Sequence, residues 1–140
     1  MMKELENIKV NVNGTEVEAV KVNGVTLVNL TPHDVNYYVD GNQAFTVPNS
    51  GLPAIRLPEE NVNVHTKYGM EFTSKVYTEA QNLPNKQDGV LYIVSKMVLD
   101  AVNRNDFIAP DTGDGAVRDV DGTVTGRKGN ILGTTRWVVA

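Results

Sequence analysis

The chain has 140 residues, of which 41% are hydrophobic and 21% charged, and its net charge is −4. This length suits one ordinary domain, and the composition argues against long disorder. Because cysteine is absent, there is no disulfide framework and no thiolate site for zinc or redox chemistry. The negative charge disfavours non-specific binding to duplex nucleic acid or to an anionic membrane.

No targeting or membrane-spanning segment is predicted. Residues 1–6 lack the apolar core of a signal peptide. The longest apolar runs, such as Val90–Val94, have the length of a strand and are too short to span a bilayer. We therefore expect a cytoplasmic protein, either of a cell or of an infected host cell.

The N-terminal part of the chain predicts a β-meander. Residues 8–12 alternate between apolar and polar with a period of two, which is the pattern of a half-buried strand. Asn13-Gly14 and Asn23-Gly24 favour tight hairpin turns, because both residue types tolerate positive φ. We expect residues 1–24 to be a hairpin extension and a candidate oligomerisation arm, followed by a single β-rich domain over residues 25–140.

Short extended segments separated by turns continue through the middle of the chain. Thr31-Pro32-His33-Asp34 interrupts the pattern, because proline removes a backbone donor and restricts the residue before it. The next predicted strands are residues 35–39, 44–47, 54–57, 62–66 and 70–78. The last of them alternates, with Phe72 and Val76 on one face and Glu71 and Lys75 on the other.

The C-terminal part holds the most apolar run and the one predicted helix. Val90–Val94 predicts a central strand that is buried on both faces. Ser95 follows directly and is a good N-cap, and apolar residues then recur at helical spacing. Residues 107–115 are interpreted as a loop, because proline, glycine and aspartate are frequent there. The last predicted strands are residues 116–120, 123–128 and 131–139.

Apolar and polar residues alternate with a period of two along almost the whole chain. This pattern predicts a mainly β fold, an antiparallel sandwich or a small barrel, with one short α-helix near residues 95–104. Chains of this type often cover exposed strand edges by associating with copies of themselves. We therefore expect a homo-oligomer.

No catalytic or metal-binding motif stands out. The motifs G-x-S-x-G, H-E-x-x-H and the glycine-rich phosphate loop are absent from the sequence. His65 lies in an alternating strand, whereas His33 either caps a turn or contacts a ligand at a strand end. The loop aspartates near the C-terminus, which lack the order of an EF-hand, are Asp111, Asp114, Asp119 and Asp121. We predict no catalytic residue, no metal site and no cofactor.

Anion binding is the more informative hypothesis. A strand that runs directly into a helix presents unpaired N–H groups, to which Ser95 adds a hydroxyl and Lys96 a charge. The alternative is ordinary helix capping. Arginine is suited to bidentate phosphate recognition, but each arginine here can equally form a surface ion pair worth under about 1 kcal/mol. The predicted ligand contacts are His33, Ser95, Lys96, Arg104, Asp106 and Arg118.

Several short motifs follow one another in a fixed order. They are Asn29-Leu30-Thr31-Pro32-His33-Asp34-Val35, Tyr68-Gly69, Asn82-Leu83-Pro84, Ile93-Val94-Ser95 with Val98 and Ala101, Arg104-x-Asp106, Pro110, and Arg118-Asp119-x-x-Gly122-x-x-x-Gly126. Over about residues 25–133, this order resembles a family of small proteins encoded by bacteriophages and prophages. Asn82 and Lys96 depart from it, since a glycine and an arginine are expected there. The resemblance implies a phage or prophage origin and no particular reaction.

Three functions are compatible with these sequence motifs. The first is a non-catalytic sponge that sequesters a small anionic nucleotide signal of host immunity, such as an ADP-ribose derivative or a cyclic oligonucleotide. The second is a structural or interaction protein of the virion. The third is an enzyme, for example a nucleotide hydrolase that uses Asp106 or Asp119, although no paired acid and base are visible. We expect the first function.

Overall fold

This computed structural model describes residues 5–119 and 130–140, and these residues contain twelve strands and one helix. The elements are β1 (Leu5–Val12), β2 (Thr15–Val22), β3 (Val25–Asn29), β4 (Val35–Val39), β5 (Asn42–Val47), β6 (Glu59–Lys67), β7 (Met70–Tyr77), β8 (Val90–Ile93), α1 (Lys96–Val102), β9 (Phe107–Pro110), β10 (Ala116–Arg118), β11 (Ile131–Thr134) and β12 (Trp137–Val139). The predicted class, mainly β with one short helix, is confirmed. The sheets contain both antiparallel and parallel pairs, and among the described residues none of them closes into a barrel.

The largest sheet has six strands in the order β1-β2-β3-β8-β9-β12. Its first three strands form the predicted meander, in which β1 pairs antiparallel with β2, and β2 with β3. The first turn favours the antiparallel pairing of β1 with β2, because Asn13 and Gly14 have φ of 50° and 88°, as a type I′ hairpin turn requires. The N-terminal hairpin is therefore part of the main sheet, and the expected division at residue 24 falls inside that sheet.

A parallel crossover lies at the centre of the sheet. β8 pairs in parallel with β3 on one side and with β9 on the other, and α1 connects β8 to β9. The prediction that residues 107–115 form a loop is wrong for Phe107–Pro110. This strand has four residues, three of them buried, so it carries no alternation that marks it as a strand. Its pairing is decided by β8 and β12, which are distant in sequence.

Two apolar layers form the core, one on each face of the six-stranded sheet. On one face, Tyr92 and Phe107 pack with Leu99 of α1. On the other face, Ile93 and Ile108 pack against Val35 of β4 and its neighbours in β5. Adjacent residues of β8 thus enter opposite layers, which confirms the prediction of a central strand buried on both faces.

The second sheet has four strands in the order β10-β11-β4-β5 and covers the second apolar layer. The prediction of one strand over residues 131–139 is wrong, because β11 belongs to this sheet and β12 to the six-stranded one. The chain changes sheets at Thr135-Arg136, where the buried Thr134 hydroxyl lies 2.7 Å from the Arg136 carbonyl oxygen. The predicted strand at residues 123–128 lies outside the described residues.

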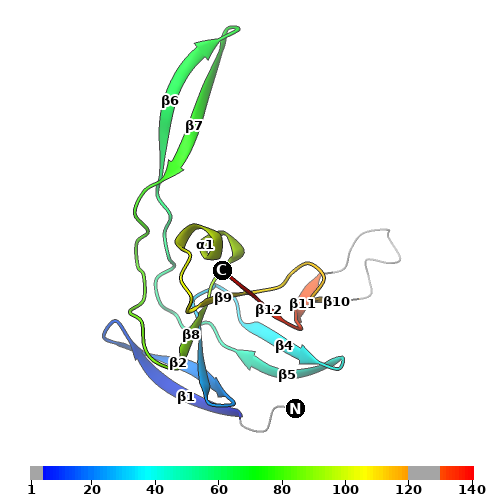
Figure 1. Cartoon of the computed structure of the whole chain (residues 1–140). Coiled ribbons are helices and arrows are strands. Elements are labelled where there is room, and N and C mark those ends of the chain that lie inside the picture. Colours follow the sequence, from blue (N-terminus) through cyan, green and yellow to red (C-terminus); the bar gives the residue numbers. More distant parts are fainter. Residues whose placement is uncertain (1–4, 120–129) are drawn as a thin grey trace.

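A long hairpin stands away from both sheets (Figure 1). It consists of β6 and β7, which pair only with each other and form a separate two-stranded sheet. Extended segments at residues 48–58 and 78–89 connect it to the body, where the predicted strand at residues 54–57 is reduced to one bridge between Arg56 and Gln81. We call residues 59–77 the arm.

Within the part of the chain that the structure describes, no helix is long and apolar enough to cross a membrane.

Candidate functional site

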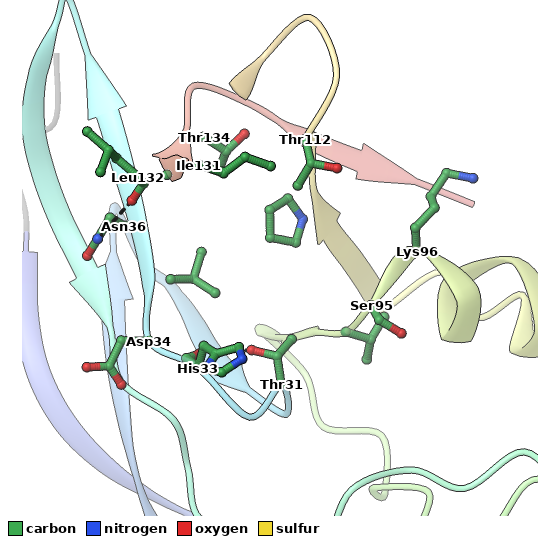
Figure 2. Close-up of a pocket in the computed structure, with 14 residues that line it drawn as sticks. Thr31, His33, Asp34, Asn36, Ser95, Lys96, Thr112, Ile131, Leu132 and Thr134 are labelled. Atoms are coloured by element: carbon green, nitrogen blue, oxygen red, sulfur yellow. Dashed lines mark hydrogen bonds between the residues drawn. The ribbon is translucent and has the colours of Figure 1, made fainter. Parts of the chain in front are cut away.

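A cleft of about 400 Å³ opens between the two sheets (Figure 2). One wall is the edge where the parallel strands β3, β8 and β9 reach their carboxyl ends, and the other comes from β4 and β11. Strand ends at one edge of a parallel sheet bring their following residues together, which makes such edges common places for ligand sites. The cleft is lined by Thr31, His33, Asp34, Val35, Asn36, Val94, Ser95, Lys96, Pro110, Thr112, Ile131, Leu132, Gly133 and Thr134.

The turn that carries His33 is held from beneath by a buried amide. Asn29 is fully buried and its Nδ2 donates to the carbonyl oxygens of His33, at 2.7 Å, and Val47, at 3.0 Å. Its Oδ1 accepts from the backbone N–H of Thr31 at 2.9 Å and from the Thr31 hydroxyl at 2.6 Å. Asn29, rather than the His33 imidazole, therefore fixes this turn, and the exposed His33 side chain faces the cleft.

Ser95 and Lys96 stand at the start of α1, beside the cleft. The Ser95 hydroxyl accepts from the backbone N–H of Val98 at 3.3 Å, so the predicted capping role is confirmed. Lys96 Nζ lies 2.7 Å from both carboxylate oxygens of Asp100, and the two side chains are 59% and 63% exposed. An exposed pair of this kind is worth under about 1 kcal/mol, so the ammonium group is easily available to a ligand.

Arg104 and Asp106 lie at the opposite edge of the sheet, before β9 begins. Arg104 Nε and Nη2 donate to the two carboxylate oxygens of Asp106 at 2.9 and 2.6 Å, and Nη1 donates to the Pro84 carbonyl oxygen at 2.7 Å. The guanidinium carbon lies 4.5 Å from the centre of the Phe107 ring. Neither residue lines the cleft, and their charges are used to anchor the loop before β8.

Arg118 lies in β10, close to the cleft but outside its lining. One of its Nη atoms is 3.5 Å from the carbonyl oxygen of Thr112, which does line the cleft. Of the six predicted ligand contacts, the structure thus gathers His33, Ser95 and Lys96 around one cavity and places Arg118 near its rim.

Sequence reasoning missed the residues that form the far wall. Asn36 Nδ2 donates to the Leu132 carbonyl oxygen at 3.0 Å and so links β4 to β11 across that wall. Ile131 and Leu132 remain 45% and 43% exposed although they are large and apolar. No local signal marks these residues, because β4 and β11 are about a hundred positions apart and meet only in the folded chain.

Asp111 and Arg136 stabilise the region where the chain passes between the sheets. The Asp111 carboxylate accepts from Arg136 Nε and from the Gly113 backbone N–H, and these bonds lower the pKa of Asp111 below its ordinary value. A lowered pKa in the folded state stabilises the protein above the unfolded carboxyl pKa, and this stabilisation is lost as the pH falls through the folded value.

Replacing Asp111 with asparagine should therefore lower the melting temperature at pH 7, and the difference from wild type should shrink as the pH falls through the lowered pKa of the wild-type carboxyl. Melting temperatures from pH 7 to pH 2 measure this. Asp114→Asn is the control, because the Asp114 side chain is 99% exposed and its carboxylate lies 4.0 Å from Arg136. A gap between Asp111→Asn and wild type that is the same at every pH would contradict the prediction.

Among residues 5–119 and 130–140, no three histidine or acidic side chains come together as a metal site requires. Asp121, one of the loop aspartates considered from the sequence, lies outside these residues.

No known protein-family model matches the chain, and no curated protein or solved structure is significantly similar to it. The resemblance to phage-encoded proteins therefore stays a prediction from the sequence.

Proposed function

We propose that this protein binds a small anionic ligand in the cleft at the carboxyl ends of β3, β8 and β9, and that it does so without turnover. One observation carries the proposal: a cleft of about 400 Å³ brings His33, from the turn after β3, together with Ser95 and Lys96, from the start of α1. This volume lies within the range of about 300–1,000 Å³ that is usual for small-molecule sites.

The composition of the cleft supports a ligand with both an apolar and an anionic part. Val35, Pro110 and Ile131 supply apolar surface, on which a planar ring or a sugar can lie. Lys96 supplies a positive charge at the rim, and Thr31 and Thr112 add hydroxyl groups. Sites that combine apolar walls with a few convergent polar groups fix the orientation of a ligand through the polar groups.

A nucleotide has these two parts, since its base is planar and its phosphates are anionic. We propose a nucleotide signal of host immunity as the ligand, either an ADP-ribose derivative or a cyclic oligonucleotide. The support for this narrower class is the order of short motifs that resembles phage-encoded proteins, together with the position of Thr31, His33 and Ser95, which belong to those motifs and line the cleft.

Thermal shift with ADP-ribose derivatives and cyclic oligonucleotides tests this function. A ligand at a hundred times its dissociation constant stabilises the native state by about 2.7 kcal/mol, which raises the melting temperature by roughly 5–10 °C. We expect Lys96→Glu to abolish most of the shift. Lys86→Glu is the matched control, because Lys86 is an exposed lysine at the opposite edge of the same sheet and should leave the shift unchanged.

The proposal would be contradicted if no ligand raised the melting temperature. Equal shifts for Lys96→Glu and Lys86→Glu would contradict it as well. Recovery of the ligand after heating the complex separates binding from turnover. Unchanged ligand supports sequestration, whereas a modified ligand indicates an enzyme.

A second candidate function is that of a structural or interaction protein of the virion. The arm favours it, because a two-stranded sheet that projects from the body presents a long surface to other molecules (Figure 1). The two functions are compatible, since the arm and the cleft share no residue.

A further inference from the structure

The arm receives almost no support from the rest of its own chain. Residues 59–79 contain no buried side chain, and only Val62 is half-buried. An isolated two-stranded hairpin is marginally stable in water, because fixing each residue costs about 1–2 kcal/mol in backbone entropy. A hairpin of this length therefore needs a surface to pack on, and the described chain provides none.

One face of the arm is the more apolar of the two. The register pairs Glu60 with Val76, Val62 with Ser74, His65 with Phe72, and Lys67 with Met70, so these side chains share a face. We call this set the inner face of the arm. Met70, Phe72 and Val76 are 56%, 41% and 46% exposed on it, and the His65 ring stacks on Phe72 with ring centres 5.7 Å apart.

The opposite face is more polar. It carries Glu71, Thr73 and Lys75 together with Val64 and Tyr77, and Lys75 Nζ lies 3.4 Å from a carboxylate oxygen of Glu59. A bulge at Asn63, whose φ is 56°, shifts Val64 onto this face, so the apolar residues of β6 are divided between the two faces.

The two ends of the inner face carry opposite charges. Glu60 lies at the base of the arm, and Lys67 lies at its tip beside the turn at Tyr68-Gly69. When two arms lie face to face and antiparallel, the tip of each one meets the base of the other. A twofold axis then places β6 over β6 and β7 over β7, so that Glu60 meets Lys67 twice, Met70 meets Val76 twice, Val62 meets His65 twice and Ser74 meets Phe72 twice.

We propose that the inner faces of two arms pack together in this antiparallel manner and hold two copies of the chain as a twofold-symmetric dimer. A twofold interface must be complementary to itself, and a face with Glu60 at its base, Lys67 at its tip and apolar side chains along its length meets that condition. The occupant of the inner face is thus the same face of a second copy. This inference is independent of the ligand proposed for the cleft.

Sedimentation velocity of the full chain at several concentrations tests the dimer. We expect the wild type to dimerise and Phe72→Glu to weaken the dimer by about tenfold or more, because two charges then enter an apolar contact. Val64→Glu is the matched control, since Val64 is 58% exposed on the opposite face of the same arm and should have little effect. Neither residue contacts the core, so both variants keep the fold.

Charge exchange tests the antiparallel geometry. Glu60→Lys alone and Lys67→Glu alone each place like charges against each other, and we expect each to weaken the dimer by roughly threefold to tenfold. The double variant restores both pairs and should dimerise like wild type. Mixing the two single variants should also restore the dimer, because the mixed pair unites opposite charges at both ends.

Three results would overturn the proposal. The first is a monomer at every concentration, which assigns the arm to a different partner. The second is an equal effect of Phe72→Glu and Val64→Glu, as expected if arms pair edge to edge with both faces in solvent. The third is a dimer weakened by Phe72→Glu that the double charge exchange does not restore, which rules out the antiparallel arrangement.

Discussion

Replacing Asn29 with alanine should destabilise the protein by about 3–5 kcal/mol, since each buried polar group left without a partner costs roughly 1–3 kcal/mol. The Asn29 amide joins the end of β3 to the turn at His33 and to β5. Its loss leaves the carbonyl oxygens of His33 and Val47 and the N–H of Thr31 without this partner. Only the Thr31 hydroxyl, which also lies 2.9 Å from the His33 carbonyl oxygen, offsets part of this.

Chemical denaturation with urea measures this loss as a shift in the unfolding midpoint at constant m value. Asn36→Ala is the control, because the Asn36 amide is more accessible and links β4 to β11 near the surface, so its removal should cost about 1 kcal/mol. An Asn29→Ala variant within about 1 kcal/mol of wild type would refute the role assigned to this amide.

The second large effect is expected at Arg104 and Asp106. Their side chains are 16% and 12% exposed, so removing one partner leaves a poorly solvated charge, and we expect Arg104→Ala to cost about 2–3 kcal/mol. Arg104→Ala also removes the hydrogen bond to the Pro84 carbonyl oxygen and the contact with Phe107.

A double-mutant cycle with Asp106→Ala measures the coupling between the two side chains, which we expect to be about 1–2 kcal/mol in favour of the pair. Because both residues lie at the edge opposite the cleft, Arg104→Ala should leave the thermal shift produced by a cleft ligand unchanged. If Arg104→Ala instead abolished the thermal shift without lowering the stability of the protein, Arg104 would be a ligand contact, as the sequence predicts.

Local patterns in the sequence were sufficient for a large part of the fold. The Asn-Gly turns fix the first meander, because their positive φ values suit the twist of the adjoining strands. Val90–Val94 is recognisable as a buried strand since all of its residues are apolar or aromatic. Ser95 marks the start of the helix through its side-chain oxygen. Each of these signals acts over a few residues and can be read without knowing the partner strand.

Features that depend on distant partners were missed. Phe107–Pro110 is a strand because β8 and β12 pair with it on both sides, and nothing within its four residues indicates this. The break between β11 and β12 depends on the buried Thr134 hydroxyl and on the Asp111 carboxylate, which belong to contacts across the chain. The sequence predicted strands at residues 62–66 and 70–78, but nothing in it indicated that they pair only with each other and form a separate sheet.

Backbone preferences and the period of two act locally, so the sequence alone predicts the fold class, the turns of the meander, the central strand and the capped helix. It also named three residues that line the cleft, since His33, Ser95 and Lys96 each follow a predicted strand. Contacts between distant segments make these strands parallel neighbours, which brings their carboxyl ends to one edge of the sheet and places Arg104 and Asp106 at the other. Strand pairing is a property of distant segments, so the site that it assembles appears only when the chain is folded.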